Sequence, residues 1–151
     1  MKWLAGIAVV TGAMAGCAGS AAQRDGETLD QTIQVFNENM RWERFEKAAL
    51  WLPPRQRAQA IDDWDERSKD VKITDWEVVK VDPHGAGEAH AQVKLSWYRE
   101  SEQIVRETRA VQTWEKHGHA WIMVDETRLR GDEMPGLPEA HVDVPKRQGS
   151  R

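Results

Sequence analysis

The sequence feature that most restricts the fold is an alternation of apolar and polar side chains over residues 89–98. Successive side chains of a β-strand point to opposite faces, so this pattern predicts a strand with one face buried and one face in water. The buried face would carry Ala89, Ala91, Val93, Leu95 and Trp97. A sheet containing such a strand needs a second layer of structure over its apolar face.

Three further strands are indicated around this one. Residues 71–81 are rich in β-branched side chains and are followed by a turn sequence that begins Asp82-Pro83. Residues 104–115 and 120–125 also have strand character, and residues 116–119 between them have the composition of a hairpin turn. Strands joined by such short turns pair antiparallel, which predicts a four-stranded meander.

Helical spacing precedes the strands. Thr28 is the expected N-cap of a stripe formed by Leu29, Ile33, Phe36 and Met40. A second stripe over residues 42–52 lies roughly opposite the first, so either one helix is apolar on two faces or the helix breaks near residues 40–42. We favour the break. Pro53 and Pro54 end this segment, and a further helix that buries one face, with Ala58, Ile61 and Trp64, is predicted over residues 54–68.

These elements predict one α+β domain over residues 28–127, with N-terminal helices packed on a four-stranded antiparallel sheet. Residues 18–27 are small and polar and indicate a flexible tether. Residues 128–151 contain prolines, glycines and charges without an apolar period, so a disordered tail is expected there.

The N-terminus has the layout of a secretory signal, because Lys2 precedes an uncharged run from Trp3 to Gly16 that is too short to span a bilayer. The run leads through Met14-Ala15-Gly16 into Cys17, the single cysteine of the chain. These residues resemble the lipobox of bacterial lipoproteins, although Met14 stands where that family prefers Leu. The resemblance implies a signal peptide over residues 1–16, cleavage before Cys17 and lipidation of Cys17, including acylation by a fatty acid such as palmitate. A hydrophobic helix of a soluble protein and an ordinary cleaved signal with a free thiol are the alternatives.

The lipobox resemblance also implies a location. A lipoprotein of this kind is held in the cell envelope by its lipid and faces the periplasm. In a Gram-negative cell, an Asp after the lipidated cysteine tends to retain the protein in the inner membrane, and Ala18 here implies the outer membrane instead.

The charge and the cysteine count limit the partners. A formal charge of −4 gives no basic surface for nucleic acid or anionic lipid, so we expect attachment to the membrane through the N-terminal lipid and no nucleic-acid partner. One cysteine cannot form an intramolecular disulfide, so the fold depends on its own core. The expected partner is another envelope protein.

Element order and scattered aromatic residues point to a superfamily. A broken helical segment at residues 41–48, a strand opening at residues 72–78, and a last hairpin with Gln112-Thr113-Trp114-Glu115 and Gly118-His119-Ala120-Trp121 are similar to the nuclear-transport-factor-2-like superfamily. The similarity covers residues 28–127 and implies a cystatin-like α+β cone, in which helices and a curved sheet enclose an apolar cavity. Members use this cavity as an enzyme site, a ligand pocket or a core, so the fold does not choose the function.

Enzymes of this superfamily that isomerise or dehydrate place an Asp, or a His with a carboxylate, inside the cone, where burial raises a carboxyl pKa. The candidates here are Asp75, Glu77, His90 and Arg109. None of them lies in a motif that matches the family. Asp75 is expected to cap or bulge the first strand, and His90 falls on the polar face of the second. No catalytic residue is therefore assigned.

The aromatic residues that line either a pocket or a core are expected to be Trp42, Phe45, Trp76, Trp97, Trp114 and Trp121. Large aromatics in a small domain are more often core, so core is the preferred interpretation, and no cofactor is implied.

A metal site needs converging ligands, and none is predicted. His84, His117 and His119 fall in turns and are expected to be exposed. The acidic group Asp62, Asp63, Asp65 and Glu66 lacks the spacing of a calcium loop. Asp63 with Arg67 and Asp65 with Lys69 are instead expected to form helix-spaced ion pairs.

The sequence thus favours a non-enzymatic interaction or structural module on a lipid anchor. The alternative is a small-molecule binder or a proton-transfer enzyme that uses the cone. The two hypotheses differ in whether the cone holds a wet cavity with a converging acid and base or is filled by Trp side chains.

Overall fold

The computed structural model describes residues 28–140. The predicted signal peptide, Cys17 and the tether lie outside these residues and stay predictions. Within the described range no helix is both long and apolar enough to cross a membrane. The elements are helices α1 (Leu29–Arg41), α2 (Phe45–Ala48) and α3 (Arg57–Ser68), the 3-10 turns η1 (Ala49–Trp51) and η2 (Pro54–Gln56), and strands β1 (Val71–His84), β2 (Glu88–Arg99), β3 (Arg106–His117) and β4 (Ala120–Gly131).

Local sequence signals set the bounds of α1. The Thr28 side chain accepts a hydrogen bond from the backbone N–H of Gln31, and the Gln31 side chain accepts one from the Thr28 backbone, which is a capping box. After Arg41 the backbone turns through Glu43, whose φ is 53°, and α2 begins at Phe45. The predicted break between the two apolar stripes is therefore confirmed.

The predicted helix over residues 54–68 begins instead as a 3-10 turn and becomes α-helical at Arg57. Trp64 is its one buried residue, so the expectation of a single buried face holds, but Ala58 is exposed and Ala60 packs toward the core in its place.

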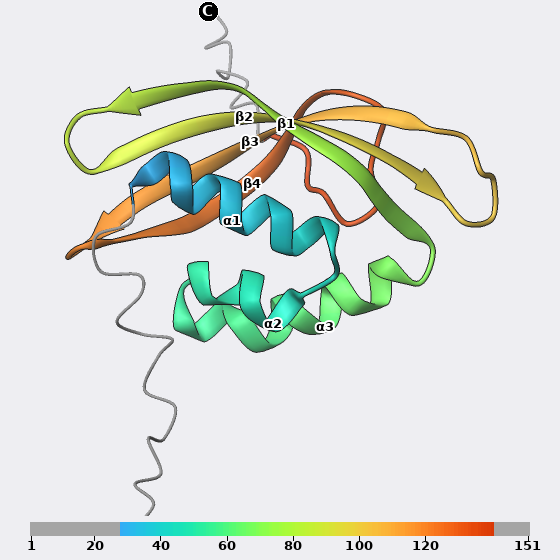
Figure 1. The fold of residues 1–151 in the computed structure, drawn as a ribbon, viewed down its shortest axis with the longest axis horizontal. Helices are drawn as coiled ribbons and strands as arrows, with labels where there is room; N and C mark the ends of the chain where they lie inside the picture. The colour runs from blue at the N-terminus through green and yellow to red at the C-terminus, as the bar shows by residue number, and fades with distance from the viewer. Residues whose placement is uncertain (1–27, 141–151) are drawn as a thin grey trace, which may run out of the picture.

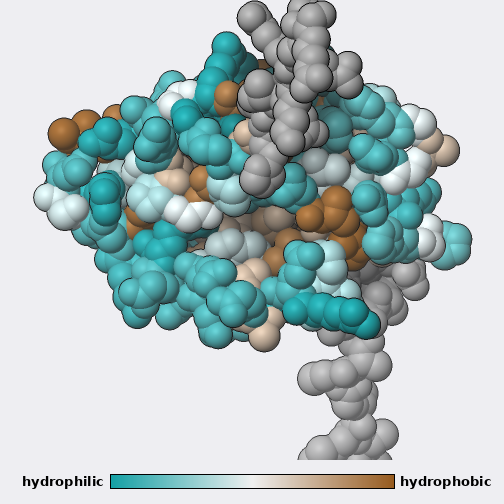
Figure 2. Space-filling model, turned by 180° about the vertical axis from the view of Figure 1, so that it is seen from behind, coloured by the Kyte–Doolittle hydropathy of each residue, from teal (hydrophilic) through white to brown (hydrophobic). Residues whose placement is uncertain are grey.

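The sheet is an antiparallel meander in the order β1-β2-β3-β4 and is not closed, so the α+β class is confirmed. In β2 the predicted apolar face is buried at every position, and the opposite face is partly buried. Figure 1 shows the helices on one side of the curved sheet, with α1 next to it. On the face seen in Figure 2, hydrophobic residues form small separate areas within a mainly hydrophilic surface.

Several strand boundaries differ from the prediction. β1 continues past Val81 because Asp82 and Pro83 still pair with β2. β3 begins at Arg106, and Ile104 and Val105 are exposed in the preceding loop. β4 continues to residue 131, well beyond the predicted end at 125, because its partner β3 supplies pairing positions as far as Thr108.

The expected disordered tail was wrong for residues 128–140. After β4, Met134 and Leu137 are buried in the core, and Arg128 pairs with Glu139 as an isolated parallel bridge. Two apolar side chains separated by a turn have no helical or strand period, so the sequence pattern does not predict their burial. Residues 141–151 lie outside the described range.

Edge strand β1 contains two irregularities. Its register with β2 shifts between Ile73 and Asp75 and again between Val78 and Lys80, which leaves Thr74 and Val79 without partners in the pairing. The Thr74 hydroxyl donates instead to the Ser96 carbonyl at 3.1 Å. Asp75 thus follows a bulge, as expected.

Candidate functional site

Aromatic side chains fill the inside of the cone. Phe36 of α1 packs edge-on against Trp114 of β3, with ring centroids 5.6 Å apart, and against Trp64 of α3 at 6.1 Å. Trp97 of β2 is also buried, and its indole N–H donates to the Thr108 hydroxyl at 2.8 Å. This packing leaves little space between the helices and the sheet.

A polar cluster lies beside these rings. Gln112 of β3 is fully buried, and its amide nitrogen donates to the side-chain oxygen of Asn37 on α1 and to the Glu126 carboxylate of β4, both at 2.9 Å. The amide nitrogen of Asn37 donates to the Ile33 carbonyl at 2.8 Å and to the Gln112 side-chain oxygen at 3.2 Å. The cluster is thus held by one helix and two neighbouring strands.

Burial raises the pKa of the Glu126 carboxyl, against the hydrogen bond from Gln112 and the positive charge of Arg67, which both lower it. Burial likewise lowers the pKa of the Arg67 guanidinium, and the charge of Glu126 opposes that shift. The Arg67 guanidinium and the Glu126 carboxyl therefore shift each other's pKa, although the two groups are not close enough to form an ion pair.

The space next to this cluster is small. A void of about 10 Å³ borders the cluster at Asn37, Arg67 and Glu126. Its lining also includes Met134 and Leu137, from the segment that follows β4. A void of this size holds about one water molecule. The arrangement can bind a water or hold a proton on Glu126, but it has no room for an organic substrate as it stands.

The predicted catalytic candidates lie elsewhere. Asp75 is exposed and pairs with Arg41 at 3.8 Å, and Glu77 is exposed and pairs with Lys94 at 2.7 Å. His90 lies on the polar face of β2, as expected, next to Glu88 at 3.1 Å. Arg109 pairs in register with Lys94 and Arg130 along β3. Three of the four candidates thus lie around Lys94 on the polar face of the sheet, and none of the four lies inside the cone.

Sequence reasoning missed Asn37, Gln112, Glu126 and Arg67. One signal was available, because Gln112 falls between Ala110 and Trp114 in the alternation of β3 and is, like Thr108, a polar residue on the buried face. Glu126 was placed one residue beyond the predicted end of the last strand, so its pairing with Gln112 was not expected.

A second candidate site is an open groove outside the cone, between α1 and β1. The Glu38 carboxylate accepts one hydrogen bond from the indole N–H of Trp42 at 2.6 Å and another from that of Trp76 at 3.2 Å. The groove has a volume of about 290 Å³ and is lined by Gln34, Val35, Glu38, Asn39, Arg44 and Trp76. An aromatic side chain combined with polar groups is typical of surfaces that bind another protein.

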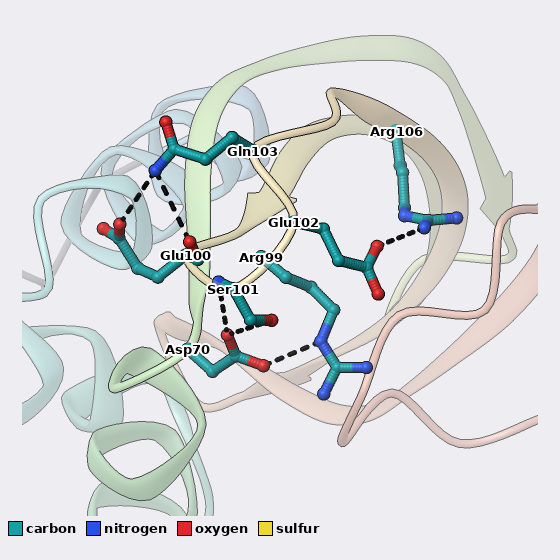
Figure 3. Close-up of polar contacts among 7 residues, drawn as sticks. All are labelled: Asp70, Arg99, Glu100, Ser101, Glu102, Gln103 and Arg106. Atoms are coloured by element: carbon teal, nitrogen blue, oxygen red, sulfur yellow. Dashed lines mark hydrogen bonds and ion pairs between the residues drawn. The ribbon is translucent and has the colours of Figure 1, made fainter.

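A third recess of about 440 Å³ lies between the end of α3, the start of β1 and the segment at Pro135 and Gly136. Figure 3 shows the loop between β2 and β3 folded over Asp70, which accepts hydrogen bonds from Arg99 at 2.7 Å and from the Ser101 hydroxyl at 3.2 Å. These contacts lower the pKa of the Asp70 carboxyl, with Arg99 as the main cause. The charges at this recess are therefore largely satisfied within the chain.

The predicted aromatic set divides into core and surface. Trp97, Trp114 and Phe45 are core residues, and Trp76 and Trp121 are partly buried against the core. Trp42 is 55% exposed, so its placement in the core or a pocket was wrong: it follows the last residue of α1, where the chain turns away from the sheet. Trp51 and Trp64 belong to the core as well.

The predicted helix-spaced ion pairs are also corrected. Lys69 pairs with Glu66 rather than Asp65, and Asp63 accepts a hydrogen bond from Gln59 while Arg67 turns toward the interior. His84, His117 and His119 are exposed, as expected, and the His117 ring lies 3.0 Å from the Glu115 carboxylate. Within residues 28–140 no three potential metal ligands converge.

Comparison of the sequence with known protein families and with curated proteins found no match. Solved structures do match the fold. A SEC-C motif-containing protein from Rhodopseudomonas palustris superimposes with a TM-score of 0.61 at 10% identity, over 73% of this chain and 85% of that one. A ketosteroid isomerase-like protein from Erwinia carotovora atroseptica gives a TM-score of 0.56 at 7% identity, over 68% of this chain and 94% of that one.

Proposed function

We propose that this protein is a lipid-anchored protein of the cell envelope whose domain is a non-enzymatic interaction module. The domain has the nuclear-transport-factor-2-like fold of the ketosteroid isomerase-like neighbour, and the anchor is inferred from the lipobox resemblance at Cys17. In a Gram-negative cell the domain would face the periplasm from the outer membrane. Its partner would be another envelope protein.

The proposal is supported by the position of the open space, which lies outside the cone and not inside it. Inside the cone, Phe36, Trp97 and Trp114 are packed, and the void beside Glu126 holds about one water. Outside the cone, the groove between α1 and β1 is open and has an indole in its wall. Aromatic and arginine side chains at such surfaces contribute much of the binding free energy in protein complexes, so Trp76 and Arg44 are the expected contact residues.

Photo-crosslinking in intact cells tests this proposal. A photoreactive amino acid at Gln34, which is exposed and lines the groove, should give one discrete adduct with an envelope protein. The same amino acid at Arg55, exposed on η2, is the matched control. Trp76→Ala should abolish the adduct at position 34. Equal adducts at both positions, or an adduct that survives Trp76→Ala, would contradict the proposal.

A small-molecule binder or a proton-transfer enzyme is the second candidate, and Glu126 is the observation that favours it. A buried carboxyl with a raised pKa, close to a guanidinium, is a common arrangement at catalytic sites. Turnover of a ketosteroid by the purified protein, lost in Glu126→Gln, would support this candidate. A steroid does not fit the void as it stands, so such turnover would also require the interior to open.

A further inference from the structure

The segment that follows β4, residues 132–140, closes the cone from one side. Met134 and Leu137 are its two buried side chains, and both border the void beside Asn37, Arg67 and Glu126. We call this segment the strap. Its side chains occupy the space that would otherwise connect the polar cluster with the surface.

Polar contacts hold the strap at its two ends. At the start, the Asp132 carbonyl accepts a hydrogen bond from the Thr108 hydroxyl at 2.6 Å, and the Asp132 side chain accepts one from the Glu107 backbone at 3.1 Å. At the far end, the Arg128 guanidinium donates to Glu139 at 2.6 Å, and the Arg128 backbone N–H donates to the Pro138 carbonyl, also at 2.6 Å. The far end therefore depends on Arg128.

The middle of the strap has few polar contacts of its own. The Leu137 N–H donates to the Met134 carbonyl at 3.1 Å, which closes a tight turn. Gly136 in this turn has a φ of 76°, and a Cβ there would lie 3.1 Å from the Arg67 side chain. Between its two ends, the strap is thus held mainly by the burial of two apolar side chains.

We infer that the strap is an autoinhibitory element, and that releasing its far end from Arg128 opens the interior of the cone to a small neutral molecule. The apolar part of such a molecule would replace Met134 and Leu137 against Met40, Ile73 and Leu95. A hydroxyl group would donate to the side-chain oxygen of Asn37, which accepts one hydrogen bond, from Gln112. The molecule should be neutral, because Arg67 and Glu126 border this space and offset each other's charge, so a buried ligand charge would have no partner of its own.

Local opening of the strap can be distinguished from global unfolding, because the two make different side chains accessible. Met134 on the strap, Met40 behind it and Met123 on β4 are all buried. Opening of the strap exposes Met134 and Met40 but leaves Met123 in the sheet. Global unfolding exposes all three together.

Methionine oxidation by hydrogen peroxide measures this in the full-length protein in its own membranes, with the oxidised fraction of each methionine read by mass spectrometry. Arg128→Gln should raise the oxidation rates of Met134 and Met40 about fivefold and leave the rate of Met123 unchanged. Arg130→Gln, which changes an exposed arginine on the same strand, is the matched control and should change none of them. Glu139→Gln removes the ion pair between Arg128 and Glu139 by changing its exposed partner on the strap. This variant replaces Arg128→Gln in the experiment if Arg128→Gln does not fold.

The ligand is tested with 4-methylphenol as the probe. If it binds in place of the strap, it should raise the oxidation rate of Met134 and lower that of Met40, each relative to the same protein without the probe. An oxidation rate of Met40 that stays the same or rises with that of Met134 would overturn the ligand site. A common rate for all three methionines in every variant, or no response of Met134 to either strap variant, would overturn the strap itself.

Discussion

Gln112 and Glu126 lie opposite each other on β3 and β4, and the amide nitrogen of Gln112 donates to the Glu126 carboxylate at 2.9 Å. This contact places an ionisable group at the inner surface of a packed cone.

Glu126→Gln should stabilise the domain more at neutral pH than in acid. Burial raises the pKa of Glu126 above 4.5, so folding favours the protonated form. The stability that this preference contributes is fully present below pH 4.5 and is lost as the pH rises through the folded pKa. The midpoint of thermal unfolding of Glu126→Gln, relative to wild type, should therefore rise between pH 4 and pH 7, where about 1 kcal/mol corresponds to several degrees. Asp62→Asn, at an exposed carboxylate on α3 that does not contribute to the pKa shift of Glu126, should show no such trend.

Trp97→Ala should destabilise the domain by about 3–5 kcal/mol, because it removes a fully buried indole and leaves a cavity. It also leaves the Thr108 hydroxyl without its indole donor. Trp42→Ala, at an exposed tryptophan, should cost less than about 1 kcal/mol. Urea unfolding of both variants gives the comparison, and equal losses would show that Trp97 is not a core residue.

Truncation after Thr127 should destabilise the domain by roughly 3–6 kcal/mol, at about 1.5–3 kcal/mol for each buried apolar side chain. The truncation removes Met134 and Leu137 together with the end of β4. Truncation after Ala140 keeps these residues and is the matched control. A midpoint of thermal unfolding that is the same in both truncated proteins would mean that the strap adds nothing to stability.

Cys17→Ser should leave an uncleaved precursor and abolish labelling by a fatty-acid probe, because lipid transfer requires the thiol. Immunoblotting measures the size of the product, and metabolic labelling measures the acylation. Ordinary processing and lipid-free release of the variant would refute lipidation at this position.

Ala18→Asp should shift the protein toward the inner membrane if the source is a Gram-negative cell, while wild type should travel with outer-membrane markers. Density-gradient fractionation of membranes distinguishes the two. Wild type in the inner-membrane fraction would refute the sorting prediction and leave lipidation at Cys17 unaffected.

Pattern reasoning predicted the elements of the fold well because their patterns are local. The alternation of β2 and the helix break after Arg41 each follow from a few neighbouring residues. The strap was missed because Met134 and Leu137 are buried by contacts with segments far away in the sequence.

The polar cluster was missed for a related reason. Asn37, Gln112 and Glu126 come from three separate elements, and only their packing together makes them a cluster. A polar residue on a buried face, such as Gln112, indicates that a partner exists but does not identify it.

The two bulges of β1 affect how copies of this chain meet. A long, regular edge strand offers a row of free backbone groups on which a second chain can pair, and this promotes aggregation. Thr74 and Val79 interrupt that row, and Pro83 lacks an N–H near its end. The proposed lipid anchor at Cys17 would concentrate copies of this chain in the plane of a membrane, where such edges would meet often. The irregular edge of β1 disfavours sheet extension between copies under those conditions.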